Sequence, residues 1–80
     1  MVKPTRVTND IRARRFAAGE MTQADLARQV GLTRQTIIAI EQGRYSPSLE
    51  VAFKIARVLG ASIEEVFHYP TEPGPASGNR

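Results

Sequence analysis

Apolar residues recur at helical spacing in five short segments, and the pattern is clearest after Thr22, a typical N-cap residue. Leu26 and Val30 fall on one face of a predicted helix over residues 23–30. Gly31 suits the left-handed backbone that ends a helix. The first well-marked element is therefore a short amphipathic helix.

A second capped segment begins three residues further on. Thr33 is the N-cap of a predicted helix over residues 34–42, Ile37 and Ile40 form its inner face, and Gly43 ends it. Two short helices joined by a three-residue turn that contains glycine have the layout of a helix-turn-helix motif.

Three further helices flank this pair. The first covers residues 9 or 10 to 18, with Asn9 as its N-cap, and the fourth covers residues 49–59, with Ser48 as its N-cap. The fifth is a turn or two that runs through Phe67 and begins at the S-x-x-E capping box of Ser62. The apolar side chains that these helices offer to a core are Ile11, Phe16, Ala18, Leu49, Ala52, Phe53, Ile55, Ala56 and Leu59.

Five helices and no predicted strands indicate an all-α fold, a compact five-helix domain with a central helix-turn-helix. A chain of 80 residues buries only a little over ~60% of its unfolded surface, enough for one core. We expect a domain over 9–69 and an N-terminal arm over 1–8. The Pro- and Gly-rich end, 70–80, is expected to be a flexible tail.

Charge is distributed unevenly along the chain. Residues 1–44 hold eight basic and four acidic side chains, a balance of +4, whereas residues 45–80 hold three basic and four acidic, a balance of −1. A basic half on a neutral scaffold fits a polyanionic partner. A charged face kept for solubility explains the same numbers, so charge alone leaves the partner open.

The composition removes several classes of chemistry. The chain has no Cys, which excludes disulfides, thiolate metal sites and thiol catalysis. Its one histidine, His68, cannot form a zinc site without further ligands. No apolar run approaches the roughly 18 residues of a membrane span, and the N-terminus lacks the apolar stretch of a secretion signal. We therefore expect no enzyme activity, no metal, no cofactor and no membrane partner.

The outward face of the 34–42 helix carries groups that can read base pairs. At roughly 100° per residue, four side chains lie opposite its apolar face: Gln35, Ile38, Ala39 and Gln42. Arg34 and Gln35 occupy the first turn, where a helix that enters the major groove meets base edges. Arg can bind guanine, and Gln adenine, through two hydrogen bonds each. Because Arg and Gln are also good helix formers, an ordinary exposed surface is the alternative.

Neighbouring residues can hold the phosphates beside such a groove. Gln23, at the start of the preceding helix, can offer its side-chain amide and its backbone N–H to a phosphate oxygen. Arg44 can flank the same groove as a phosphate clamp. Thr33 and Gln42, at the two ends of the 34–42 helix, complete the predicted backbone contacts.

One long stretch, MTQADLARQVGLTRQTIIAIEQGRYSPSLEVAFKIARVLGASIEEVF, follows the rhythm T-Q-x-x-L-A-x-x-x-G-(L/V)-(S/T)-x-x-x-I-x-x-x-E-x-G, then P-S-L, V-L-G and S-I-E-E-V-F. It resembles the helix-turn-helix domain of phage Cro proteins and repressors, the xenobiotic-response-element family. More narrowly, the chain resembles very short bacterial regulators of that family. The resemblance covers about residues 9–67 and implies a lambda-repressor-like fold and sequence-specific binding to double-stranded DNA.

The resemblance also implies roles for single positions. It places backbone contacts at Gln23 and Arg44 and base contacts at Arg34, Gln35, Thr36 and Ala39. Arg15 and Glu41 stand where many members form a salt bridge between the first helix and the recognition helix. The chain departs from the family at Arg14, where Leu is common, and in the 19–21 loop, which is one residue longer than in many phage repressors.

A single module of this size reads only a half-site. We therefore expect a homodimer on a pseudo-palindromic operator, with half-sites roughly 34 Å apart. Its interface is predicted at Val66, Phe67 and Tyr69, with closure of the core by Phe67 as the alternative.

Two biological roles fit these residues. A bound dimer would occlude a promoter and repress it, and activation through contact with RNA polymerase is equally compatible. The alternative is an antitoxin, or another protein-binding module, that binds a toxin partner and autoregulates its operon. In either role we expect a cytoplasmic, nucleoid-associated protein.

Overall fold

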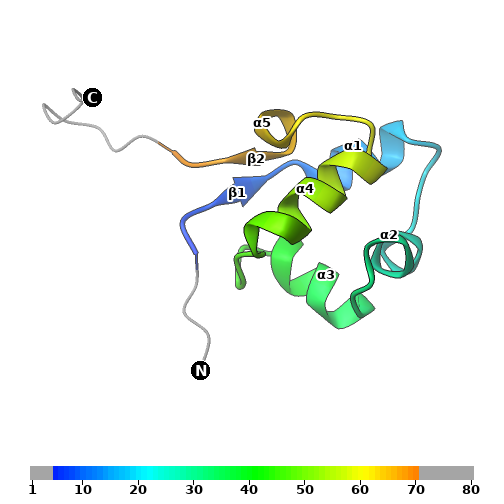
Figure 1. Cartoon of the computed structure of the whole chain (residues 1–80), viewed down its shortest axis with the longest axis horizontal. Coiled ribbons are helices and arrows are strands. Elements are labelled where there is room, and N and C mark those ends of the chain that lie inside the picture. Colours follow the sequence, from blue (N-terminus) through cyan, green and yellow to red (C-terminus); the bar gives the residue numbers. More distant parts are fainter. Residues whose placement is uncertain (1–4, 71–80) are drawn as a thin grey trace, which may run out of the picture.

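The computed structural model describes residues 5–70, and its helices surround one small core (Figure 1). In the view of Figure 1, α4 crosses the middle of the molecule, with α2 and α3 below it and α1 and α5 above it. The expected all-α architecture is confirmed, with five helices in the part of the chain that the structure describes. The elements in chain order are β1 (Thr8–Asn9), α1 (Ile11–Ala17), α2 (Gln23–Val30), α3 (Arg34–Glu41), α4 (Leu49–Val58), α5 (Ile63–Val66) and β2 (Phe67–His68).

The core is built from one to three buried apolar side chains of each helix. Helices of four to ten residues are marginal on their own in water, so they depend on burying these faces against one another. Each aliphatic side chain that is fully buried stabilises the fold by roughly 1.5–3 kcal/mol. The largest fully buried side chains are Ile11, Leu26, Ile37, Ile40, Ile55 and Val66.

Four of the five predicted helix caps are confirmed. The side-chain oxygens of Thr22, Thr33, Ser48 and Ser62 each accept a hydrogen bond from a backbone N–H in the first turn of α2 to α5. The prediction of Asn9 as the cap of α1 was wrong. The N-cap position of α1 is held by Asp10, whose side chain makes no capping hydrogen bond.

Asn9 instead connects two distant elements. Its Oδ1 accepts a hydrogen bond from the Ile11 N–H (3.1 Å), and its Nδ2 donates to the carbonyl oxygen of Ile40 at 2.9 Å. One side chain therefore ties the start of α1 to the C-terminal end of α3.

The expectation of no strands was wrong in one place. β1 and β2 pair antiparallel, with Thr8 opposite His68 and Asn9 opposite Phe67, and they lie side by side in Figure 1. Phe67 therefore belongs to a strand and not to the last helix. Strands of two residues are too short to show alternation in a sequence, and their pairing joins opposite ends of the chain.

The fold also begins earlier than the predicted boundary at residue 9. Thr8 is paired in the sheet, and the Thr5 N–H donates a hydrogen bond to the Gly43 carbonyl at 3.2 Å. Part of the predicted arm therefore contacts the domain. Residues 1–4 of that arm, and all of the predicted tail except Pro70, lie outside the described residues.

Three large apolar residues expected in the core are on the surface. The exposed fractions are 52% for Phe16, 68% for Leu49 and 53% for Phe53. Short helices need only one face for a core of this size, so side chains at the margin of the apolar stripe stay outside. Phe16 lies beneath the guanidinium groups of Arg12 and Arg15, at 5.6 and 5.5 Å from its ring centre.

The capping box of α5 gives a testable pH dependence. Hydrogen bonds with the Ser62 N–H (2.8 Å) and hydroxyl, helped by the Arg14 guanidinium, lower the pKa of Glu65 below its ordinary value of 4.5. Because the folded pKa is depressed, this contribution to stability is present above the unfolded value and is lost as the pH falls through the folded pKa. We expect an NMR titration of the Glu65 carboxyl carbon to give a lower midpoint in the folded chain than in urea. Equal midpoints would contradict the capping box. Ser62→Ala should narrow the difference between the midpoints without abolishing it, because the hydroxyl is lost while the backbone N–H of residue 62 and the Arg14 guanidinium remain.

Candidate nucleic-acid interface

The turn between α2 and α3 fixes the relative direction of the two helices. Gly31 has a left-handed φ of 77°, which reverses the chain after α2. The next residue, Leu32, closes the end of α2 by donating its N–H to the Ala27 carbonyl at 2.9 Å. Thr33 Oγ1 then accepts the Thr36 N–H at 3.1 Å and begins α3. The predicted helix-turn-helix is present.

The α3 helix presents the face that the sequence predicted. Ile37 and Ile40 are 0% and 2% exposed and point into the core. On the other side, Arg34, Gln35 and Gln42 are exposed, whereas Thr36, Ile38 and Ala39 are half-buried. The Thr36 hydroxyl lies 3.0 Å from the hydroxyl of the exposed cap residue Thr33, so it belongs to the cap as much as to the surface.

Two hollows lie on either side of α3. A groove of about 950 Å³ separates it from α1 and the start of α2, and its lining includes Arg12, Phe16, Gln23, Arg34 and Gln42. A smaller hollow of about 210 Å³ lies on the other side and is lined by Gln35, Thr36, Ala39, Arg44 and Tyr45. The outer edge of α3 is therefore a ridge, with Arg34 facing one hollow and Gln35 the other.

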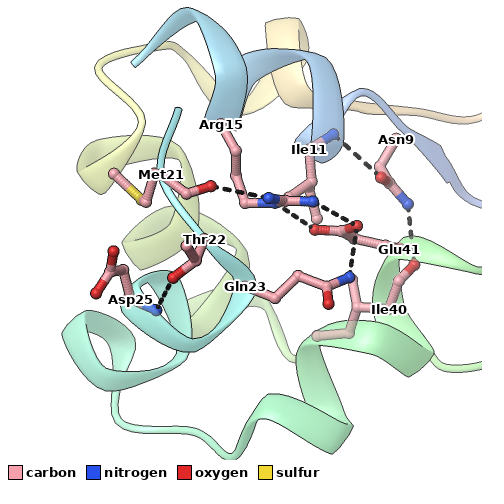
Figure 2. Close-up of polar contacts among 9 residues, drawn as sticks. All are labelled: Asn9, Ile11, Arg15, Met21, Thr22, Gln23, Asp25, Ile40 and Glu41. Carbon is pink, nitrogen blue, oxygen red and sulfur yellow. Dashed lines mark hydrogen bonds and ion pairs between the residues drawn. The ribbon is translucent and has the colours of Figure 1, made fainter. Parts of the chain in front are cut away.

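A buried ion pair anchors this ridge to the rest of the domain (Figure 2). Arg15 Nε donates to Glu41 Oε2 at 2.8 Å and Arg15 Nη2 to Glu41 Oε1 at 3.2 Å, while Arg15 Nη1 donates to the Met21 carbonyl at 2.8 Å. The side chains of Arg15 and Glu41 are only 7% and 10% exposed. The pair joins α1, the loop before α2 and the C-terminal end of α3, which holds α3 at one angle.

Gln23 completes the network on the groove side. Its Nε2 donates to Glu41 Oε1 at 3.1 Å, and Figure 2 shows the side chain running from the start of α2 toward Glu41. One amide hydrogen is thus committed within the protein, and the second remains for another acceptor. The backbone N–H of Gln23, in the first turn of α2, has no intrahelical acceptor. Because Arg15 neutralises the charge of Glu41, this carboxylate repels an anion in the groove less strongly than an unpaired carboxylate would.

Arg44 and Gln42 form a local pair at the end of α3. Arg44 Nε donates to Gln42 Oε1 at 2.8 Å, and both side chains are exposed. The Arg44 backbone N–H donates to the Ala39 carbonyl at 2.9 Å, which places Arg44 directly behind the helix end. The guanidinium is therefore held beside the smaller hollow.

Two residues of this surface were not singled out from the sequence. Arg12 lines the same groove as Gln23, and Tyr45 lines the same smaller hollow as Arg44. Helical spacing could have found Arg12, which lies three residues before Arg15 on the same face of α1. Tyr45 lies in a loop without periodicity, so only the fold could place it.

The predicted dimer interface needs a correction. Val66 is 0% exposed and part of the core, so its side chain is not available to a second copy. Phe67 is half-buried and packs against that core, whereas Tyr69 is 68% exposed. Of the three predicted residues, only Tyr69 is well exposed at the surface.

The described residues contain no group of three or more His, Asp or Glu side chains that could hold a metal ion. Within the same part of the chain, no helix combines the length and the apolar character that a membrane crossing needs.

Relatives of this chain are named as transcriptional regulators. An HTH-type regulator of Methanocaldococcus jannaschii is 57% identical over 53 residues, which are 66% of this chain and 80% of the relative. A regulator of Methanothermobacter thermautotrophicus is 62% identical over 48 residues, 59% of this chain and 70% of that protein. The HTH-type regulator PuuR of Escherichia coli is 36% identical over 53 residues, 66% of this chain but only 29% of its own length.

Solved structures share the fold. A crystal structure of a protein from Bacteroides fragilis aligns with a TM-score of 0.70 over 78% of this chain and 98% of its own, at 24% identity. The clp gene regulator ClgR of Corynebacterium glutamicum aligns with a TM-score of 0.61 over 66% of this chain and 55% of its own, at 28% identity.

The helix-turn-helix family model matches residues 11–66, well over half of the chain. This match covers the elements from α1 to α5 and both sides of the α3 ridge. The chain belongs to the Cro/repressor-type helix-turn-helix family, the xenobiotic-response-element family of DNA-binding transcriptional regulators.

Proposed function

We propose that this protein is a sequence-specific repressor that binds a pseudo-palindromic DNA operator as a homodimer, with α3 in the major groove. The observation that carries the proposal is the division of α3. Its Ile37 and Ile40 are buried, while Arg34 and Gln35 stand exposed at its first turn. The names of the relatives, HTH-type transcriptional regulators, support a role in transcriptional regulation.

The base-reading roles follow the two sides of the ridge. Gln35 is exposed and can bind adenine through two hydrogen bonds, while Ala39, in the same hollow, leaves room for a thymine methyl group. Arg34 can bind guanine from the groove side. Ile38 and Thr36 each supply an apolar contact to the bases, Thr36 through its methyl group.

Other residues supply the contacts to the DNA phosphates. On the groove side, Gln23 offers one side-chain amide hydrogen and a backbone N–H at the start of α2. On the other side, Arg44 brings a cation. Thr33 and Gln42 bring polar groups at the two ends of α3, with Gln42 on the groove side. Contacts of this kind position the helix without reading sequence.

Two copies are needed for useful specificity because one module covers a single half-site. Half-sites about one helical turn apart, roughly 34 Å, would place two α3 helices in successive major grooves on one side of the duplex. A dimer bound over a promoter would exclude RNA polymerase and repress. A transcription assay distinguishes repression from activation, with a promoter that carries the DNA site selected by the protein from random duplexes. Added protein should lower the yield of transcript.

The base-reading assignment is tested by two matched substitutions on DNA selected from a random duplex pool. Gln35→Ala should cost about 1–3 kcal/mol of binding free energy per half-site and relax preference at one base pair. Arg44→Ala should weaken binding to selected and unselected duplexes alike, because it removes a phosphate contact. Fluorescence anisotropy with both duplexes measures the two effects.

Gln29→Ala is the control, because Gln29 is an exposed glutamine on α2 that lines neither hollow. It should bind as the unaltered protein does. If Gln35→Ala and Arg44→Ala change binding to both duplexes equally, α3 does not read bases. If no duplex is selected and a small protein partner co-purifies instead, the antitoxin role replaces the proposal.

A further inference from the structure

The outer face of α4 carries two large apolar side chains that no other part of the described chain covers. Leu49 and Phe53 are 68% and 53% exposed and lie one helical turn apart. With Glu50, Lys54 and Arg57 they line a hollow of about 550 Å³. Single exposed apolar residues are ordinary, but two large ones beside a hollow mark a contact surface. We call these five residues the α4 stripe.

The remaining ends of the chain offer little that could cover this stripe. Residues 71–80 contain no aliphatic side chain larger than alanine or proline, and residues 1–4 contribute only Met1 and Val2. These two segments therefore offer few apolar side chains for the α4 stripe.

The charges of the α4 stripe are arranged so that the stripe complements itself. Its acidic residue, Glu50, is near the N-terminal end of α4, and its cations, Lys54 and Arg57, lie toward the C-terminal end. Lys54 Nζ is 3.8 Å from Glu50 Oε2 within the helix, and both side chains remain more than half exposed. Two such stripes placed antiparallel would bring the acidic end of each to the basic end of the other.

We propose that the α4 stripe is the interface between two copies of this chain, which pair antiparallel about a two-fold axis beside Phe53. Glu50 is three residues before Phe53 and Arg57 four residues after it, so each Glu50 faces the partner's Arg57. The two Phe53 rings and the two Leu49 side chains fill the space between the helices. A two-fold interface of this kind uses the same patch on both copies.

This inference rests on the homodimer in the proposed function but not on its DNA contacts. It places the interface on α4 instead of at Val66, Phe67 and Tyr69. One face of a three-turn helix is small against the roughly 800 Å² per partner of a standard interface. The dimer of the free protein is therefore weak and forms in the micromolar range.

Charge reversal tests the antiparallel pairing. Sedimentation equilibrium across the micromolar range should show that Glu50→Lys and Arg57→Glu each raise the dimer dissociation constant by about tenfold, because each places like charges opposite one another twice per dimer. The double variant Glu50→Lys/Arg57→Glu restores opposite charges and should return to within about threefold of the unaltered protein. Rescue of this kind is not expected from a loss of folding.

The matched control is Glu64→Lys, which makes the same change of charge on the exposed surface of α5. It should leave the dissociation constant unchanged, as should Tyr69→Ala. If these two variants weaken the dimer and the α4 variants do not, the interface lies at the β2 end and the inference is wrong. A chain that stays monomeric both free and on selected DNA would remove the dimer altogether while leaving the Gln35 test of DNA reading intact.

A cross-link checks the same geometry without changing charge. Because the chain contains no cysteine, Phe53→Cys introduces a single thiol at the proposed two-fold axis. Mild oxidation should convert most of this variant to a covalent dimer, at least about tenfold faster than Gln29→Cys, a thiol on the exposed surface of α2. Equal rates for the two variants would overturn the antiparallel pairing.

Discussion

Arg15→Met is expected to destabilise the domain by about 3–5 kcal/mol, because it leaves a buried carboxylate without its counter-charge. Glu41 is 10% exposed and is held by two hydrogen bonds from Arg15, and the Met21 carbonyl loses its donor as well. Native domains have only about 5–15 kcal/mol of stability, so a loss of this size removes a large part of it. Urea unfolding followed by circular dichroism measures the change.

Two further variants test whether the unpaired buried charge is the cause of that loss of stability. Arg15→Met/Glu41→Leu removes both charges and should recover most of the stability, since no buried charge is then left unpaired. Arg28→Met breaks the 3.2 Å pair of Arg28 with Asp25, whose side chains are 71% and 44% exposed, and should cost less than about 1 kcal/mol. If Arg15→Met is as mild as Arg28→Met, the network does not anchor α3.

Operator affinity is expected to fall by about 10³-fold when monovalent salt is raised from about 50 to about 200 mM. Three exposed cations, Arg12, Arg34 and Arg44, line the hollows beside α3, which gives six in a dimer. Each cation that replaces a counterion on the duplex adds about 0.9 to the slope of log affinity against log salt. Anisotropy titrations at several salt concentrations give this slope, expected near −5.

The contribution of one position to that slope can be isolated. Arg44→Ala should make the slope of the dimer less steep by about two, one for each copy. The control is Arg28→Ala, because Arg28 is also an exposed arginine but lies on α2 and lines neither hollow. It should leave the slope unchanged. A slope near zero for the unaltered protein would mean that the α3 ridge and its cations do not face phosphates.

Most of the helix-turn-helix was predictable because its signals are local. Thr22 and Thr33 bond to N–H groups three residues away, and Ile37 and Ile40 are one turn apart. The outward position of Gln35 follows from the same periodicity. The resemblance added the pairing of Arg15 with Glu41, which no local pattern indicates, since 26 residues separate them.

The errors came from residues whose environment depends on distant parts of the chain. Val66 reads as one more apolar residue near the end of the sequence, yet it closes the core completely. Phe53 reads as part of an apolar stripe, yet α4 needs only its other face, and more than half of the ring is exposed. The apolar character of a residue shows only that its side chain can be buried. Whether it is buried depends on how the helices pack.

The sequence by itself determined where α2 to α5 begin and which side of α3 turns outward, because caps and helical periodicity act over three or four residues. Only the tertiary structure decided that Thr8 pairs with His68, that Gln23 shares the Glu41 carboxylate, and that two hollows flank the ridge. These features join residues 18 to 60 positions apart, and such contacts depend on how whole helices pack.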